Sequence, residues 1–376
     1  LLSAPYVYRH YPETGNYAGV AGSDVYVLGP VSGTPTYDLA GLTLLPRFSL
    51  AEEEKKLNLY NWDTYIGETT LADFTAATGV EAKMDLFADN DELFAKLKGG
   101  NPGYDVIVPT NDMLERMIKA NMVMPLDHAK IPNMANIDKP FQDAAFDPGR
   151  KHSIPYMWGT LGVGYRKSKV EGGVVDSWKI LLDSDKYAGR LSLLGDAQNV
   201  IGVALKYLGH SFNSVDAAEL KKAEDLLIAQ KKYVKVFADD NGQDLLASGE
   251  VDVCQEWNGD IIQVMAEDED IAYAVPTEGS LVWQDTMAIP TGAPHPENAH
   301  AFLNFVLDAK AGAHIADTIK YATANAGAKA IMDKSYTENT SIFPPAEIVA
   351  KCEPGLYLGE EATKVRDEIW TRVQAA

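Results

Sequence analysis

From residue 57 onward, short apolar segments alternate with amphipathic ones, and this alternation restricts the fold more than any other feature. LNLYNW, VEAKMDLF and YDVIVPT are predicted strands, whereas TTLADFTAATG, DELFAKLKGG and NDMLERMIKANM are predicted helices. We expect Gly79 to end the first helix and Asn90 or Asp91 to cap the second. Repeated βα units with short connections predict a doubly wound α/β sheet, in which ligands bind beyond the carboxyl ends of the strands.

A glycine-rich passage, WGTLGVGYRKSKV, separates this half of the chain from a second α/β stretch. That stretch contains RLSLLGDAQNVIGVALKYLG, AAELKKAEDLLIAQKKY and EVDVCQEWNGDIIQVMAED. WQDTMAIP then leads into an amphipathic helical region, and GEEATKVRDEIWTRV is a further predicted helix. Because 376 residues are too many for one compact domain, we expect two lobes joined by more than one crossing strand.

Composition excludes several classes of function. The formal net charge of −21 disfavours nucleic acid and anionic membranes as partners and favours the approach of cationic solutes. No apolar run is long enough to cross a membrane, so no membrane insertion is expected. The two cysteines, Cys254 and Cys352, lack metal-binding spacing, so we expect no metal and no cofactor. Whether these cysteines form a disulfide stays open.

The first 50 residues have a different pattern from the rest. Tyr and Val alternate there with polar residues, and Gly, Pro, Asn and Ser interrupt the pattern, which is typical of two or three short hairpin strands. This β-rich segment is a separate module, an interaction segment or an artificial addition, and the sequence does not choose between them. No signal peptide is visible, and an exported chain whose signal had been removed would look the same.

No catalytic motif is present: the chain lacks GxSxG, HExxH, a Walker loop and a GxGxxG after a strand, so we predict no enzyme. What recurs is a tryptophan beside a carboxylate near a predicted strand end. The three pairs are Trp62 with Asp63, Trp257 with Asp260, and Trp283 with Asp285. One such pair usually marks only the edge of a core, but three at equivalent positions in both halves indicate a binding site.

This combination suits an alkyl-ammonium ligand. A cation over a desolvated indole face gains roughly 0.5 to 2 kcal/mol. A charge-assisted hydrogen bond to a carboxylate adds about 1.5 to 3 kcal/mol, and each buried methylene adds roughly 0.8 kcal/mol. Two charged ends and a methylene linker therefore account for a net binding free energy of about −8 kcal/mol, which corresponds to micromolar affinity.

From about residue 57 to its end, the chain resembles the periplasmic polyamine-binding proteins of ABC transporters, the putrescine- and spermidine-binding kind. The motifs that carry the resemblance, in order, are YNWDTYIG, GYDVIVPTND, IPYMWGTLGVGY, SLLGDAQNVIGVALKYLG, EWNGD, WQDTMAIP, YATANAGAKA and IFPPAEI. The resemblance implies a hinged, monomeric, bilobal binding protein of the type II periplasmic fold, which closes around a polyamine and delivers it to a membrane permease. It also implies a periplasmic location.

The implied division of the chain places residues 57–164 and 286–345 in lobe 1 and residues 165–285 in lobe 2. Residues 346–376 form a C-terminal helical segment that packs on the lobes, and residues 1–50 form the β-rich segment outside the resemblance. The ligand-binding residues that the resemblance implies are Trp62, Asp63, Tyr65, Thr110, Asp112, Asp196, Asn199, Glu256, Trp257, Asp260, Trp283, Asp285 and Tyr321.

Several of these positions depart from the family pattern. Asp63 stands where Ser or Thr is usual, Asp112 stands where spermidine binders have an aromatic residue, and Asn199 stands where an amine-binding Glu is common. Glu256, before Trp257, either replaces that lost Glu or points to the opposite face of its strand. We expect Asp285, Asp260 and Asp196 to take the ammonium groups.

Three alternatives remain at this stage. The chain is a ligand sensor or interaction protein on the same scaffold, it binds another organic cation, or it binds a sugar or an amino acid. An amino-acid site needs an arginine for the ligand carboxylate, and Arg166, which follows GVGY, is the nearest candidate. We expect Arg166 to lie outside the site.

Overall fold

The computed structural model describes residues 7–11, 16–21, 24–28, 53–239 and 241–376. The chain divides into two compact units, Leu1–Glu54 and Lys55–Ala376. In the first unit, β1 (Val7–Tyr11), β2 (Asn16–Ala21) and β3 (Asp24–Leu28) form an antiparallel sheet in the order β1-β2-β3. These strands agree with the predicted hairpins, while the rest of the prediction for residues 1–50 lies outside the described residues.

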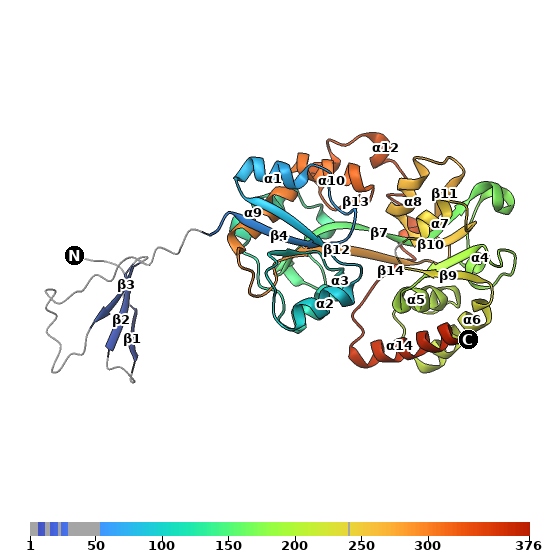
Figure 1. Ribbon diagram of the computed structural model, residues 1–376, viewed down its shortest axis with the longest axis horizontal. Helices are drawn as coiled ribbons and strands as arrows, with labels where there is room; N and C mark the ends of the chain where they lie inside the picture. The colour runs from blue at the N-terminus through green and yellow to red at the C-terminus, as the bar shows by residue number, and fades with distance from the viewer. Residues whose placement is uncertain (1–6, 12–15, 22–23, 29–52, 240) are drawn as a thin grey trace. The chain divides into compact units, whose positions relative to one another are not determined.

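The second unit is built on one mixed sheet, drawn in Figure 1. In the described part of the chain it has eleven strands. They are β4 (Lys56–Asn61), β5 (Glu81–Leu86), β6 (Val106–Ile107), β7 (Ser153–Arg166), β8 (Leu191–Leu194), β9 (Val234–Ala238), β10 (Val253–Trp257), β11 (Ile271–Ala274), β12 (Leu281–Ala288), β13 (Ala322–Thr323) and β14 (Glu353–Pro354).

The main path of this sheet joins two parallel groups of strands. β5, β4 and β6 are parallel to one another, and so are β10, β8 and β9. Between the groups, β12 and β7 pair antiparallel with each other and with the neighbouring strand on each side. The two parallel groups are the expected signature of repeated βα units, because a crossover helix returns each strand in the same direction.

The pairing register brings loops from both groups to the middle of β7. Trp257, at the carboxyl end of β10, pairs with Leu161, and Trp283 of β12 pairs with Gly159. Ala322 of β13 pairs with Trp158 on the same stretch of β7. Trp257, Trp283 and Ala322 therefore all pair with residues 158–161 of β7 and lie close together.

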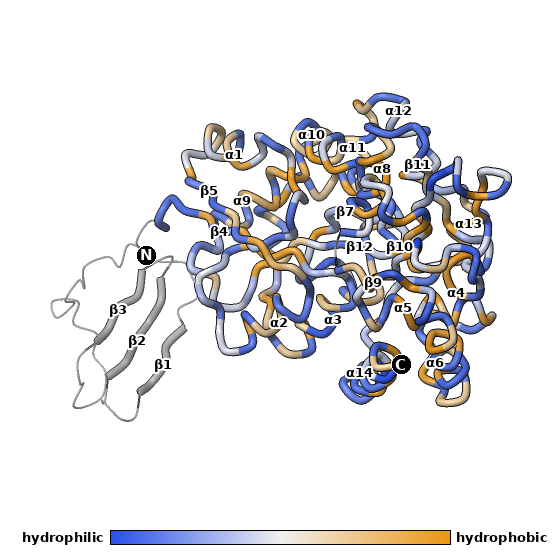
Figure 2. Tube along the Cα trace, turned by 45° about the vertical axis from the view of Figure 1, so that its right-hand side comes forward, coloured by the Kyte–Doolittle hydropathy of each residue, from blue (hydrophilic) through white to orange (hydrophobic). Residues whose placement is uncertain are grey.

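Helices cover the sheet and are amphipathic, as Figure 2 shows for α6 and α14, which carry both orange and blue residues. The α-helices are α1 (Thr70–Thr78), α2 (Asn90–Lys98), α3 (Asn111–Lys119), α4 (Lys179–Leu182), α5 (Ala197–Tyr207), α6 (Ala217–Lys231), α7 (Gly242–Ala247), α8 (Asn258–Met265), α9 (Pro296–Val306), α10 (Ala309–Ile319), α11 (Ala326–Lys329), α12 (Lys334–Thr337), α13 (Ala346–Val349) and α14 (Glu360–Ala375). Short 3₁₀ turns occupy the connections: η2 (His128–Lys130), η3 (Pro132–Asn136), η4 (Lys139–Phe141), η5 (Pro148–Arg150), η6 (Lys167–Lys169) and η7 (Glu171–Gly173).

Most predicted elements of the first half are present, with two corrections. Gly79 ends α1 in the left-handed conformation, at φ 75°, as predicted. The cap of α2 is Asp89 rather than Asn90 or Asp91, because the Asp89 carboxylate accepts the backbone N–H of Glu92. The YDVIVPT strand is only two residues long, β6, since Pro109 has no N–H to continue the ladder.

The glycine-rich passage is not a linker, because residues 153–166 form the single long strand β7. Its glycines allow other side chains to lie against the strand: a Cβ on Gly159 would collide with the Trp283 indole, and one on Gly164 would lie 2.5 Å from Ile261. Cys254 and Cys352 are both free thiols. Among the helices of the described residues, none has the length and apolar character needed to span a bilayer.

Candidate ligand-binding site

Five aromatic rings form a continuous edge-to-face chain beside the middle of β7, which we call the ring cluster: Tyr156, Tyr65, Tyr321, Trp283 and Trp257. The centroid distances between successive rings are 5.3, 5.4, 5.0 and 6.0 Å. The interplanar angles lie between 74° and 88°, the arrangement that places a positive ring edge on a negative ring face. Four of these side chains are buried, and Trp257 is partly buried.

The elements that carry the rings explain their convergence. Tyr65 follows β4, Trp257 ends β10, and Trp283 lies within β12. Gly259, in the first turn of α8, lets the Tyr321 ring lie against the helix backbone, where a Cβ would collide with it. The site therefore depends on two close approaches to glycine, at Gly159 and at Gly259.

Two carboxylates lie in the ring cluster. The Tyr321 hydroxyl donates to Asp260 Oδ2 at 2.7 Å. Burial raises the pKa of Tyr65 well above its ordinary value, and the Asp285 carboxylate, by its charge and a hydrogen bond, raises that pKa further. Burial and then Asp285 also raise the pKa of Tyr156. Asp285 is 7% exposed, so its negative charge is held among aromatic rings in a low-dielectric setting.

A second group of carboxylates is linked to the ring cluster through a backbone bridge. Asp285 forms an isolated antiparallel bridge with Thr110, the N-cap residue of α3. The Thr110 hydroxyl donates to Asp112 Oδ1 at 2.6 Å, and the charge of Asp112 acts in turn on Asp196. We call Asp112 and Asp196, with the Thr110 hydroxyl, the acidic end of the site.

Asp196 follows β8 and caps α5, where its Oδ1 accepts the backbone N–H of Asn199 at 3.0 Å. Desolvation by the surrounding protein raises the pKa of Asp196, and the charges of Asp112 and Asp91 raise it further. Asp196 is nevertheless exposed to water.

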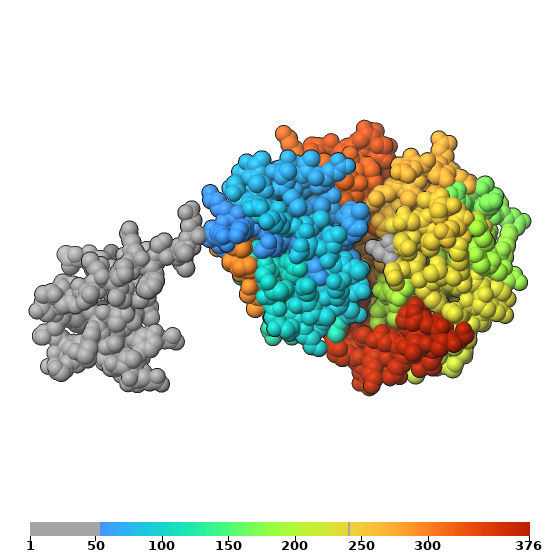
Figure 3. All heavy atoms as spheres, viewed as in Figure 1, coloured from blue at the N-terminus to red at the C-terminus, as the bar shows by residue number. Residues whose placement is uncertain are grey.

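Figure 3 shows a furrow in this unit between the blue and cyan surface, which includes α2 and α3, and the yellow surface of the α7–β10–α8 region. The loops after β4, β6, β8 and β10 belong to these two groups of strands. The sequence placed ligand-binding residues at such strand ends, and the structure brings six of them together. These are Tyr65, Trp257, Asp260, Trp283, Asp285 and Tyr321.

Four predicted residues have other neighbours. The Trp62 indole donates to Val108 O at 2.8 Å and packs on Phe87 at 4.5 Å. Asp63 is exposed and accepts the backbone N–H of Thr64. Glu256 is fully buried, with its carboxylate against Gly242 on the opposite face of β10 from Trp257. Asn199 is buried in the first turn of α5.

Residues 69–344 match the family model described as bacterial extracellular solute-binding protein. The chain belongs to this family. The putrescine-binding periplasmic protein PotF of Escherichia coli is 34% identical over 346 residues, which cover 87% of this chain and 93% of PotF. The putrescine-binding periplasmic protein SpuD of Pseudomonas aeruginosa is 33% identical over 343 residues, which cover 86% of this chain and 93% of SpuD.

Solved structures agree with the fold of this solute-binding protein. The spermidine/putrescine ABC transporter substrate-binding protein PotD of Streptococcus pneumoniae superimposes with a TM-score of 0.76 at 30% identity, covering 85% of this chain and 98% of PotD. The chain thus has the bilobal α/β fold predicted from its sequence. The predicted lobe boundaries stay a prediction.

Sequence reasoning missed Tyr156 and the two glycines beneath the rings of this solute-binding protein. Tyr156 donates its hydroxyl to Tyr65 O at 3.0 Å and so ties the loop after β4 to β7. Its position in IPYMWGTLGVGY was the available signal, since a strand with alternate glycines predicts close approach by other side chains. Arg166, the candidate for an amino-acid ligand, instead pairs with Asp268 at 2.9 Å.

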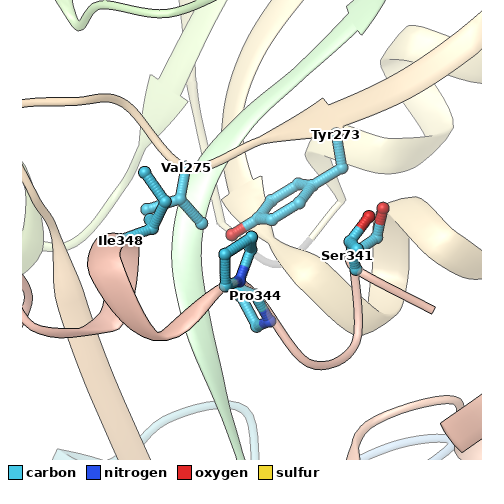
Figure 4. Close-up of a pocket in the computed structure, with 7 residues that line it drawn as sticks. Tyr273, Val275, Ser341, Pro344 and Ile348 are labelled. Carbon is cyan, nitrogen blue, oxygen red and sulfur yellow. The ribbon is translucent and has the colours of Figure 1, made fainter. Parts of the chain in front are cut away.

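A pocket of about 220 Å³ lies elsewhere in this solute-binding protein, as Figure 4 shows. Its lining residues are Tyr273, Val275, Thr340, Ser341, Pro344, Pro345 and Ile348. The lining contains no carboxylate, and the Tyr273 hydroxyl is hydrogen-bonded to Thr160. An ammonium group desolvated there would lack a counter-charge, so the pocket does not suit an amine.

Proposed function

We propose that this protein captures a polyamine of the putrescine or spermidine type between its two lobes in the periplasm and delivers it to a membrane ABC permease. It acts by binding, without catalysis. The observation that carries the proposal is the ring cluster around Asp285 and Asp260. Aromatic faces and buried carboxylates are the groups that recognise a desolvated ammonium ion.

The acidic end supports a ligand with a second positive charge. Thr110 connects Asp285 to Asp112, so negative groups continue from the ring cluster toward Asp196. A polymethylene chain between two ammonium groups would place its apolar part against the aromatic rings. The names of the relatives, which bind putrescine or spermidine, support the same ligand class.

The test is calorimetric titration of the protein with putrescine, cadaverine, spermidine and spermine. One or two of these should bind with micromolar affinity. Asp285→Asn should weaken that binding by roughly 10- to 150-fold, the equivalent of about 1.5 to 3 kcal/mol for a hydrogen bond to a charged group. Asp225→Asn is the control, because Asp225 is an exposed carboxylate on α6 that pairs with Lys221.

Refolded protein must be included, because a ligand that copurifies with the protein would occupy the site. Binding of none of the four amines after unfolding and refolding would contradict the proposal. Equal affinities in wild type and Asp285→Asn would leave an amine-binding protein whose site is not the ring cluster. Closure is measured separately: small-angle scattering should show compaction when the bound amine bridges the two lobes.

A further inference from the structure

Arg366, in α14, is a fully charged side chain enclosed by the protein at 2% exposure. Nη2 donates to Phe212 O at 2.9 Å and to Ser214 O at 3.1 Å. Nη1 donates to the backbone O of Gln198 at 3.3 Å and to its Oε1 at 3.2 Å. All four acceptors are neutral carbonyl oxygens, so the burial cost of this charge is offset by hydrogen bonds rather than by an ion pair.

Burial lowers the pKa of Arg366 to about 10, and the Asp196 charge acts on it in the opposite direction. The Asp196 carboxylate is therefore a negative charge that acts on this buried guanidinium. Gln198 lies in the first turn of α5, two residues after Asp196, which caps that turn by accepting the backbone N–H of Asn199, and both oxygens of Gln198 accept from Arg366. Arg366 thus holds the first turn of α5, the turn that Asp196 caps.

We propose that Arg366 is a positioning residue for the acidic end: by fixing the first turn of α5 and placing a positive charge behind Asp196, it maintains the carboxylate that receives the second cationic group of the ligand. Arg366 itself touches no ligand. This inference rests on the proposed function, and it makes the C-terminal helix a determinant of the preference for dications over monocations.

The charges around Asp196 explain why this support is needed. Asp91 on α2 and Asp112 on α3 both act against its ionisation, whereas Arg366 on α14 carries a positive charge that interacts with Asp196. Asp91 is itself paired with Arg116 at 3.3 Å, which offsets part of its charge. Removing Arg366 would leave the two like charges in place without its positive charge, which reduces the ionised fraction of Asp196, and it would loosen the first turn of α5 that Asp196 caps.

The experiment compares a dication with a monocation of the same chain length, putrescine and butylamine, by calorimetry and by competition. Arg366→Met removes the charge and keeps most of the side-chain volume. It should weaken putrescine by roughly tenfold, the loss expected for one weakened charge-assisted contact, and change butylamine by less than about twofold. Between pH 7.5 and 5.5 the ratio of the two affinities should fall more steeply in Arg366→Met than in the wild type.

Arg366→Lys is the second variant, and it covers the outcome that Arg366→Met does not fold. Lysine keeps the charge but cannot donate in the fork geometry to four oxygens, so the affinity ratio should fall to an intermediate value. A ratio unchanged in both variants, or an equal loss for both amines, would overturn the inference. A wild-type protein that binds neither amine would contradict the proposed function itself, and the inference with it.

Discussion

The ring cluster and the acidic end present the same charge to a ligand but are held in different ways. Asp285 is 7% exposed among rings that pack on one another and on the backbone of β7. Asp196 is exposed, and its carboxylate accepts the backbone N–H of Asn199 in the first turn of α5, a turn that the buried Arg366 contacts at Gln198. Packing fixes a position closely, whereas hydrogen bonds at a helix N-terminus leave water access and some adjustment.

The difference indicates a division of tasks. The ring cluster selects for an alkyl-ammonium group, because a desolvated cation gains most from aromatic faces. The acidic end accepts a second charge that water can still reach, so it tolerates ligands of more than one length. Variants that separate packing from charge test this comparison directly.

The largest effect is expected at the centre of the ring cluster. Trp283→Ala removes the ring that contacts both Tyr321 and Trp257, and it should lower the free energy of unfolding by about 3 to 5 kcal/mol. Urea denaturation measures the loss. Trp283→Phe keeps a ring over Gly159 and should lose much less stability. Equal losses of stability in both variants would mean that ring packing does not stabilise the ring cluster.

A smaller effect is expected when one hydroxyl is removed and the ring is kept. Tyr321→Phe breaks the 2.7 Å hydrogen bond to Asp260 and should lower the free energy of unfolding by about 1.5 kcal/mol. Tyr207→Phe breaks a similar bond to Asp183 at an exposed place and is the matched control. If the two variants lose the same free energy of unfolding, burial among the rings does not strengthen the hydrogen bond between Tyr321 and Asp260.

Replacing Asp196 at the acidic end should raise the free energy of unfolding at pH 7 rather than lower it. Because the pKa of Asp196 is raised in the folded protein, the folded state binds more protons than the unfolded state between the ordinary and the raised pKa. The free energy of unfolding therefore falls as pH rises through that interval, and the ionised Asp196 costs stability at pH 7. Asp196→Asn removes this cost while Asn keeps the N-cap of α5.

Thermal unfolding between pH 4 and 7 measures this effect. Without ligand, Asp196→Asn should be more stable than the wild type at pH 7 by less than about 1 kcal/mol, and it should bind putrescine more weakly. Asp216→Asn changes the N-cap of α6 in the same way and is the control. Loss of stability at pH 7 in Asp196→Asn alone would show that its charge supports the fold.

The smallest effect is expected at Asp63. Asp63→Asn alters an exposed carboxylate that accepts only a neighbouring backbone N–H in the described contacts, so affinity and stability should each change by less than about 0.5 kcal/mol. Calorimetric titration with putrescine compares the affinities of the variant and the wild type. A larger loss of affinity would extend the ligand-binding site from Tyr65 to Asp63 in the loop after β4, as the family resemblance implied.

The sequence predicted what depends on local pattern. Strand and helix alternation located β4, α1 and α3, and the Trp–Asp pairs located Trp257 and Trp283 of the ring cluster, whereas Tyr65 and Tyr321 came from the family resemblance. It could not predict which side of β10 faces the rings, so Glu256 stayed ambiguous until the register was known. Arg366 gave no signal, because its contact with Gln198 spans 168 residues and depends on how α14 packs on α5.

The ring cluster also makes the site observable without a label. Trp257 and Trp283 lie 6.0 Å apart in it, whereas Trp178 donates its indole N–H to Gly279 O and Trp370 packs on Phe237. Indole fluorescence depends on nearby charge and water, and a cation bound at the ring cluster changes both for Trp257 and Trp283 rather than for Trp178 and Trp370. Difference spectra of the intrinsic emission therefore report on occupancy of this site, and replacing Trp178 or Trp370 by Phe would lower the background.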